Sequence, residues 1–199
     1  MVLSSPALRS LRQTLSTSVV FIREWVRSPR SMGMVCPSST SLARAMASGV
    51  PCDKGGLVVE LGAGTGTVTV ELLRKIAPHR LIVVEQAPRM VQLLRRRFPM
   101  VRIVQGDASN LSAYLPKDER VDCIVSSLPL ISLKEHTRTA LIKEMYTSLD
   151  DGGMLIQYTY SWRDSNRFLK NTFRFMDSRK VWNNVPPARV FRFVRQYTQ

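Results

Sequence analysis

The 199-residue sequence has few cysteines and lacks a long apolar run. Cys36, Cys52 and Cys123 are odd in number and show no Cys-x-x-Cys spacing, which argues against a disulfide framework and a zinc site. No apolar run approaches the ~20 residues that a membrane-spanning helix needs. The segment "STSVVFI" is too short and too polar for the core of a secretory signal. We therefore expect a reduced cytoplasmic protein with three inert thiols and no metal ion.

Acidic residues are scarce relative to basic ones. The chain holds 29 lysines and arginines against 15 aspartates and glutamates, a net charge of +14. Residues 1–36 contain five arginines and one glutamate, a net of +4, and residues 160–199 contain nine basic and two acidic residues, a net of +7. The basic excess at both ends predicts attraction to an anionic partner, either nucleic acid or a membrane surface.

The N-terminal segment has the pattern of an amphipathic helix over residues 5–28. Its apolar stripe has helical spacing and consists of Leu8, Leu11, Leu15, Val19, Ile22 and Val26. Four arginines border this stripe on one arc, and Trp25 borders it on the other side. Such a helix suits the headgroup layer of a membrane, or it packs on the folded domain with its arginines exposed. We divide the chain into residues 1–36, the helix and its linker, and residues 37–199, the folded domain.

Strand and helix patterns alternate from Gly56 onward. Strands are expected at the short apolar runs 57–61, 80–85, 101–105, 122–127 and 154–160. Helices are expected at 67–76, 88–98 and 134–149, and a shorter one, capped by Ser38 or Ser39, should reach Met46. Residues 189–197 alternate apolar and polar side chains and predict a final strand. Alternation of this kind predicts an α/β fold with a mostly parallel sheet covered on both faces by helices.

Three glycines stand in one short loop. Gly62, Gly64 and Gly66 directly follow the strand 57–61 and precede a helix, so the backbone can turn sharply and approach a ligand closely. A dinucleotide loop would have its third glycine one residue later, where this chain has Thr67. An acid followed by Gly-x-Gly-x-Gly instead resembles motif I of class I S-adenosylmethionine-dependent methyltransferases. The resemblance implies that the cofactor contacts Glu60, Gly62, Ala63, Gly64 and Gly66.

Two later strand ends carry acids. Glu85 ends the second strand, and Asp107 follows the third. In the methyltransferase fold an acid at the first position accepts hydrogen bonds from the ribose hydroxyls, and an aspartate at the second accepts one from the adenine amino group. The agreement of motif and context predicts a cofactor site that also includes Glu85, Gln86, Gly106, Asp107, Ala108 and Ser126. The alternative is a non-catalytic α/β domain.

Several stretches resemble one family nearly end to end. "FIREWVRSPRSMGMVCPSSTSLARAM", "SSLPL", "IQYTYS" and "VWNNVPPARVF" are similar to segments of the soluble bacterial phospholipid N-methyltransferases, which methylate phosphatidylethanolamine. The resemblance implies a Rossmann-like class I methyltransferase sheet, mostly parallel with an antiparallel strand at the C-terminus, and an N-terminal amphipathic helix. "VELGAGTGTVT", "VEQAP" and "QGDA" are shared by many methyltransferases and say little about the acceptor.

The acceptor segment "SSLPL" differs from Asn-Leu-Pro-Tyr, which the related ribosomal RNA adenine dimethyltransferases carry. Ser126 or Ser127 replaces the asparagine, and Leu130 replaces the tyrosine, so no ring is available to stack a flipped base. An aliphatic amine needs instead desolvation and alignment with the methyl group. The resemblance implies that Ser127 and Leu128 contact the acceptor, and we expect their backbone carbonyls to be free to orient a nitrogen.

Several other residues have alternative roles that the sequence does not separate. Tyr158 and Tyr160 lie two apart and share one face of a strand, where their rings would hold a cationic product or pack in the core. The lipid phosphate calls for an arginine or lysine, but the sequence singles out none of the candidates Arg163, Lys180 and Arg189. His79 and His136 lack partners at metal-ligand spacing and are expected at the surface.

We therefore expect an S-adenosylmethionine-dependent N-methyltransferase that acts on phosphatidylethanolamine and its methylated intermediates, toward phosphatidylcholine. It should dock on the anionic inner face of the cell membrane as a peripheral monomer, without a nucleic-acid partner. One alternative is an RNA methyltransferase similar to the ribosomal RNA adenine N6-dimethyltransferases. Another is a membrane- or nucleic-acid-binding protein that has kept an idle cofactor fold.

Overall fold

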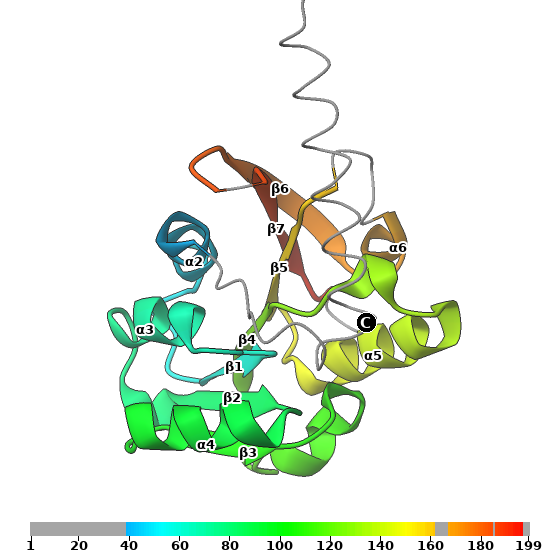
Figure 1. Ribbon diagram of the computed structural model, residues 1–199. Coiled ribbons are helices and arrows are strands. Elements are labelled where there is room, and N and C mark those ends of the chain that lie inside the picture. The colour runs from blue at the N-terminus through cyan, green and yellow to red at the C-terminus, as the bar shows by residue number, and fades with distance from the viewer. Residues whose placement is uncertain (1–38, 162–166, 185, 197–199) are drawn as a thin grey trace, which may run out of the picture. The chain divides into compact units, whose positions relative to one another are not determined.

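The computed structural model describes residues 39–161, 167–184 and 186–196 (Figure 1). The chain divides into the units Met1–Cys36 and Pro37–Gln199, and every described residue belongs to the second unit. The helix expected over residues 5–28 and the phosphate candidate Arg163 lie outside the described residues. None of the described helices is long and apolar enough to cross a bilayer.

Seven strands of the described residues form one sheet, in the order β3-β2-β1-β4-β5-β7-β6 (Figure 1). Their bounds are β1 Leu57–Leu61, β2 Leu81–Glu85, β3 Arg102–Gln105, β4 Val121–Ser126, β5 Met154–Thr159, β6 Arg174–Val181 and β7 Ala188–Val194. The first five strands pair in parallel, and β7 runs antiparallel between β5 and β6. The expected mostly parallel sheet with an antiparallel C-terminal strand is confirmed.

Helices cover both faces of this sheet. One face carries α2 Thr40–Ala47, α3 Thr67–Leu73 and α4 Pro88–Arg97, and the other carries α5 Glu135–Ser148, α6 Arg167–Lys170 and the 3₁₀ segment η2 Ala108–Tyr114. Two further 3₁₀ turns are η1 Pro78–Arg80 and η3 Leu130–Ser132. Ser39 caps α2 as expected, because its hydroxyl accepts a hydrogen bond from the Leu42 N–H at 3.2 Å.

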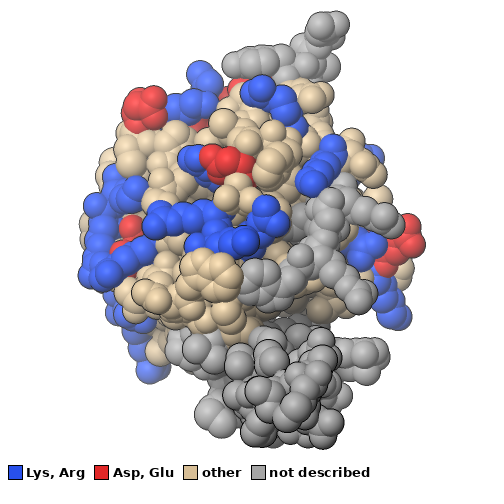
Figure 2. Space-filling view, turned by 90° about the horizontal axis from the view of Figure 1, so that it is seen from above, with Lys and Arg blue, Asp and Glu red and all other residues tan. Residues whose placement is uncertain are grey.

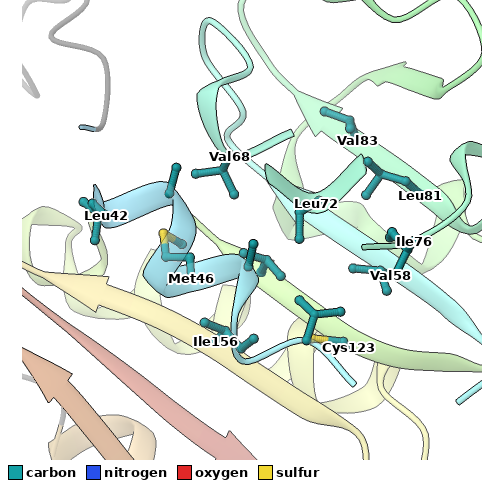
Figure 3. Close-up of a cluster of buried hydrophobic side chains, with 14 of the residues drawn as sticks. Leu42, Met46, Val58, Val68, Leu72, Ile76, Leu81, Val83, Cys123 and Ile156 are labelled. Atoms are coloured by element: carbon teal, nitrogen blue, oxygen red, sulfur yellow. The ribbon is translucent and has the colours of Figure 1, made fainter. Parts of the chain in front are cut away.

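The core consists of two apolar layers separated by the sheet. Figure 3 shows the layer beneath α2 and α3, where Leu42, Met46 and Leu72 pack toward Val58 and Ile156 of the sheet. Strands β1 and β4 are buried along their whole length, which explains their nearly continuous apolar sequence. Because both faces of the central strands are covered, polar side chains that act on a ligand must come from the strand ends.

Strand β6 is the main departure from the sequence expectation. Only Val181 of its eight residues is buried, because β6 lies at the edge of the sheet. The segment "RFMDSRKV" therefore shows no apolar alternation, and only its pairing with β7 makes it a strand. The expected final strand 189–197 is confirmed as β7, although it starts one residue earlier and ends at Val194.

The connection between β6 and β7 lies at the carboxyl end of β5, because Arg189 pairs with Thr159 (Figure 1). Asn184 in this connection is buried, and its side-chain oxygen accepts a hydrogen bond from the Ser39 N–H at 3.3 Å. Its amide group donates to the Pro186 carbonyl. Ser39 and Asn184, which are far apart in the sequence, therefore meet near the carboxyl end of β5.

Candidate functional site

The carboxyl ends of the parallel strands gather the candidate residues at one edge of the sheet. Leu61 at the end of β1 pairs with Val84 of β2 on one side and Ser126 of β4 on the other. Glu85 at the end of β2 pairs with Gln105 of β3. The loops after β1, β2, β3 and β4 are therefore neighbours, which is the usual place for a ligand in an open α/β sheet.

The glycine loop is joined to the end of β2 through Glu85. The Gly64 N–H donates to Glu85 Oε2 at 2.9 Å, and the Ala87 N–H donates to Glu85 Oε1 at 2.9 Å. Gly64 has a φ of 55°, a conformation that favours glycine. Each carboxylate oxygen keeps a second lone pair, so Glu85 can still accept two hydroxyl hydrogen bonds at a half-buried position.

The glycine loop also touches the acceptor segment. Gly62 has a φ of 72°, and a Cβ atom placed there would lie 2.9 Å from Cδ2 of Leu128. The Ser127 N–H donates to the Leu61 carbonyl at 2.9 Å, which extends the β1–β4 pairing beyond the strand end. The cofactor loop and the acceptor segment therefore form adjoining walls of one site.

Glu60 is a buried carboxyl beneath the glycine loop. Its Oε2 accepts a hydrogen bond from the Thr69 hydroxyl at 2.7 Å, whereas Oε1 is buried without a hydrogen-bond partner among the described residues. Burial raises the pKa of Glu60 to about 7; the Thr69 hydrogen bond lowers this pKa and the charge of Glu85 raises it. An orphaned carboxyl oxygen beside a glycine turn fits the ammonium of an amino-acid group.

The third strand end forms the opposite side of the edge. The Gly106 N–H donates to the Glu85 carbonyl at 3.1 Å, and the Tyr114 ring packs so closely that a Cβ on Gly106 would lie 2.4 Å from it. Asp107 is exposed and accepts a hydrogen bond from the Ser109 N–H through Oδ1. Ala108 begins η2, and Gln86 is exposed next to Glu85. A glycine beside an aromatic ring and an exposed carboxylate fits a nucleoside base.

The Leu128 carbonyl is not free, which corrects the sequence expectation. It accepts hydrogen bonds from the Leu130 N–H at 2.9 Å and from Gln157 Nε2 at 3.0 Å, so both lone pairs are used. The Ser126 hydroxyl accepts a weaker hydrogen bond from the Leu128 N–H at 3.3 Å. The acceptor segment is therefore held in shape from both sides, and its Leu128 side chain, rather than its Leu128 carbonyl, faces the loop at Gly62.

Gln157 is the residue of this site that the sequence reasoning missed. It is 1% exposed and lies beside Ser126 in the β4–β5 pairing. Its Nε2 also donates to the Tyr158 carbonyl at 2.9 Å, and its Oε1 is buried without a partner among the described residues. A glutamine inside the apolar run "MLIQYTY" was the available signal, since a buried amide needs a structural reason.

Tyr158 and Tyr160 lie on one face of the sheet, as expected. Both are half-buried against the core layer beneath α2, and their rings form an edge-to-face pair with centroids 5.3 Å apart. Leu130 is buried at 2% exposure, so the position that holds a tyrosine in the RNA enzymes presents no surface to a base.

The remaining candidates sort clearly by position. Lys180 and Arg189 are brought together as a cross-strand pair of β6 and β7. His79 and His136 are exposed, as expected. Cys52 and Cys123 are free thiols, and burial raises the pKa of Cys123 far above the usual range of a thiol. In the described ranges, no group of three His, Cys, Asp or Glu side chains could hold a metal ion.

Comparison with known proteins gives a methyltransferase family and relatives that match much of the chain. A methyltransferase domain family matches residues 58–153. Ornithine lipid N-methyltransferase from Singulisphaera acidiphila is 30% identical over 175 residues, which cover 85% of this chain and 91% of that protein. Ribosomal RNA small subunit methyltransferase A from Chlorobium chlorochromatii is 30% identical over 143 residues, 65% of this chain but only 54% of that protein.

A solved structure shows the same fold. N-methyltransferase NodS from Bradyrhizobium japonicum WM9, in complex with S-adenosyl-L-homocysteine, superposes with a TM-score of 0.60 over 80% of this chain and 85% of that chain. The sequence identity is 19%, so this likeness concerns the arrangement of the strands and helices.

The loop geometry generates a binding prediction. Gly62→Ala should weaken binding of S-adenosylhomocysteine at least roughly tenfold, because the new Cβ meets Leu128 and the φ of 72° is strained for alanine. Gly55→Ala is the matched control, since a Cβ there has no atom within 4 Å. Isothermal titration calorimetry measures both. Equal affinities of the two variants, or no affinity of the unmodified chain, would contradict the assignment of this loop.

The raised pKa of Glu60 generates a stability prediction. Because the folded state binds this proton more tightly than the unfolded state, its contribution to stability is full below pH 4.5 and is lost as the pH rises through about 7. Relative to Glu60→Gln, the unmodified chain should lose roughly 3 kcal/mol of unfolding free energy between pH 4.5 and pH 8. Urea unfolding across this range tests it, and parallel pH profiles would show that Glu60 is not the group responsible.

Proposed function

Because the chain belongs to the class I S-adenosylmethionine-dependent methyltransferases, we propose that it methylates the amine of a membrane lipid, with phosphatidylethanolamine as the acceptor. The observation that carries the proposal is the acceptor segment Ser126–Leu130. It offers the aliphatic side chain of Leu128 beside the cofactor loop, and Leu130 is buried. Neither residue can stack a flipped base.

Different residues at the carboxyl edge of the sheet fit different parts of the cofactor. Glu60 and the turn at Gly62–Gly66 fit its amino-acid end, Glu85 fits its ribose, and Asp107 with the Tyr114 ring fits its base. When bound, S-adenosylmethionine supplies the electrophilic methyl group that an amine nitrogen accepts in line with the breaking carbon–sulfur bond. The chain aligns the amine with the methyl group and excludes water from the reacting atoms, which are the main requirements of this chemistry.

The acceptor segment Ser126–Leu130, which we call the acceptor wall, is held in a fixed shape and presents an apolar side chain to the cofactor loop. The Leu128 side chain lies against Gly62, and Gln157 of β5 donates a hydrogen bond to the Leu128 carbonyl. On the other face of β5, the edge-to-face rings of Tyr158 and Tyr160 offer aromatic surfaces to a methylated ammonium group. The carboxylate of Glu60 is too deeply buried to be the final proton acceptor, so we assign proton release to solvent.

The lipid surface is part of the proposal. The amphipathic sequence of residues 5–28 and the basic C-terminal strands suit an anionic membrane, and we propose that the protein docks peripherally on the inner face of the cell membrane as a monomer. The ornithine lipid named for the relative from Singulisphaera acidiphila also carries an amine, so it is the second candidate acceptor. Ribosomal RNA is the third, because of the relative from Chlorobium chlorochromatii.

The substrate is tested by parallel incubations. The full chain, with methyl-labelled S-adenosylmethionine, is given vesicles with phosphatidylethanolamine, vesicles with ornithine lipid, or ribosomal RNA. Label is expected in phosphatidylethanolamine, and thin-layer chromatography counts the methyl groups added. Label in ornithine lipid alone would move the acceptor to that lipid, and label in RNA alone would overturn the lipid proposal.

Gln157→Ala tests the acceptor wall. Loss of the Nε2 donor frees the Leu128 carbonyl, so kcat for the lipid amine should fall roughly ten- to a hundredfold while the affinity for S-adenosylhomocysteine is kept. Gln157→Glu should also fail, because a carboxylate cannot donate to this carbonyl. The exposed Gln92→Ala is the matched control. A drop in cofactor affinity or melting temperature that accounts for the loss would assign Gln157 a purely structural role.

A further inference from the structure

We propose, on the basis of the proposed lipid substrate, that the tip of the β6–β7 hairpin is a membrane contact separate from the expected N-terminal helix. We define the tip as residues 179–184 and 186–189. Lys180 and Arg189 bind lipid phosphate, and Trp182 sits in the headgroup layer. The partner of the tip is therefore an anionic lipid surface.

The tip lies beside the acceptor wall. Val181 pairs with Ala188 at the closed end of the hairpin, and Arg189 pairs with Thr159 at the end of β5. Strand β5 is in turn the neighbour of β4, whose end carries the acceptor segment. Two strand spacings, about 10 Å, separate the backbone of Arg189 from that of the acceptor segment. An arginine side chain and an ethanolamine phosphate together span such a distance.

Two cations share one rung of this hairpin. Lys180 and Arg189 are direct cross-strand partners, and like charges in this arrangement destabilise a sheet. The sequence from residue 178 to residue 196 contains no acid, and Asp177, just before it, is paired with Arg192. A lipid phosphate placed at this pair would contact both cations.

The two cations are held on aromatic side chains of the same hairpin. The Arg189 guanidinium lies 4.9 Å from the centroid of the Phe191 ring, and the Lys180 ammonium lies 5.5 Å from that of Trp182. Arg189 Nε donates to the Ser178 hydroxyl at 2.9 Å. Within the described ranges the terminal nitrogens of Arg189 have no hydrogen-bond partner, and they are the donors that bind phosphate in a fork.

Trp182 makes the tip suited to a lipid surface. Its side chain is 62% exposed, and an indole has an apolar body with one polar N–H, which favours the membrane interface. Figure 2 looks down on the top of Figure 1, where the hairpin lies, and shows lysine and arginine side chains spread across this face with few acidic ones. Ile131, three residues beyond Leu128, is 43% exposed. Because Ile131 follows the end of β4 and the tip lies beyond the end of β5, apolar and basic side chains are exposed at the same carboxyl edge of the sheet, which favours lipid over nucleic acid.

The test follows Trp182 in the full chain. The sequence has tryptophans at positions 25, 162 and 182, so Trp25→Phe with Trp162→Phe leaves Trp182 as the single reporter. Vesicles of phosphatidylglycerol and phosphatidylethanolamine should shift its emission to shorter wavelength, and brominated acyl chains should quench it. Adding Lys180→Gln and Arg189→Gln should weaken vesicle partitioning roughly thirtyfold, because each basic residue near an anionic surface contributes about fivefold.

The matched control removes two exposed lysines at the opposite edge. Lys75→Gln with Lys117→Gln lowers the net charge equally, before the amino ends of β2 and β4, and should leave partitioning nearly unchanged. Equal weakening by both double variants would refute a localised contact, and so would an unchanged Trp182 emission. An RNA oligonucleotide that changes the emission as strongly as vesicles would make the tip a nucleic-acid surface. Since the readout needs no turnover, an emission change without lipid methylation would refute the proposed substrate alone.

Discussion

The parallel pairing of β1 with β2 and β4 is the constraint on which the site depends. Both faces of these strands are buried, so a polar side chain in the middle of a strand would be desolvated and covered by helices, away from any ligand. Function is confined to the carboxyl ends, where the register brings three loops together. The hydrogen bond from the Gly64 N–H to the Glu85 carboxylate then fixes the loop of β1 against the end of β2.

Because function is confined to the strand ends, the shape of the acceptor segment is set by hydrogen bonds of its backbone. At the end of β4 the chain turns through Pro129, and its amide groups are paired with Leu61, Ser126 and Gln157 rather than offered to a substrate. What remains toward the glycine loop is a leucine side chain. A wall of this kind selects by excluding water and by shape, which suits an amine that is already nucleophilic once neutral.

The antiparallel pair β7 and β6 extends the sheet toward a basic surface. Strand β6 runs in the same direction as β5, because both are antiparallel to β7, so the tip of the hairpin lies at the carboxyl ends of the parallel strands. The Asn184 side chain links this tip to the start of α2 through Ser39. The arrangement brings the loops after the parallel strands, the aromatic pair Tyr158–Tyr160 and the cross-strand pair Lys180–Arg189 to the carboxyl end of the sheet.

The sequence by itself determined the alternating strands and helices, the glycine loop with Glu60, Glu85 and Asp107, and the departure of "SSLPL" from the RNA enzymes. These features are local, because apolar runs, turn residues and motif spacing act over a few residues. The tertiary structure alone decided that β6 is a strand, that Gln157 donates a hydrogen bond to the Leu128 carbonyl, and that Lys180 lies opposite Arg189. Each of these depends on the register between segments distant in sequence, and a shift of one residue would turn every side chain to the other face.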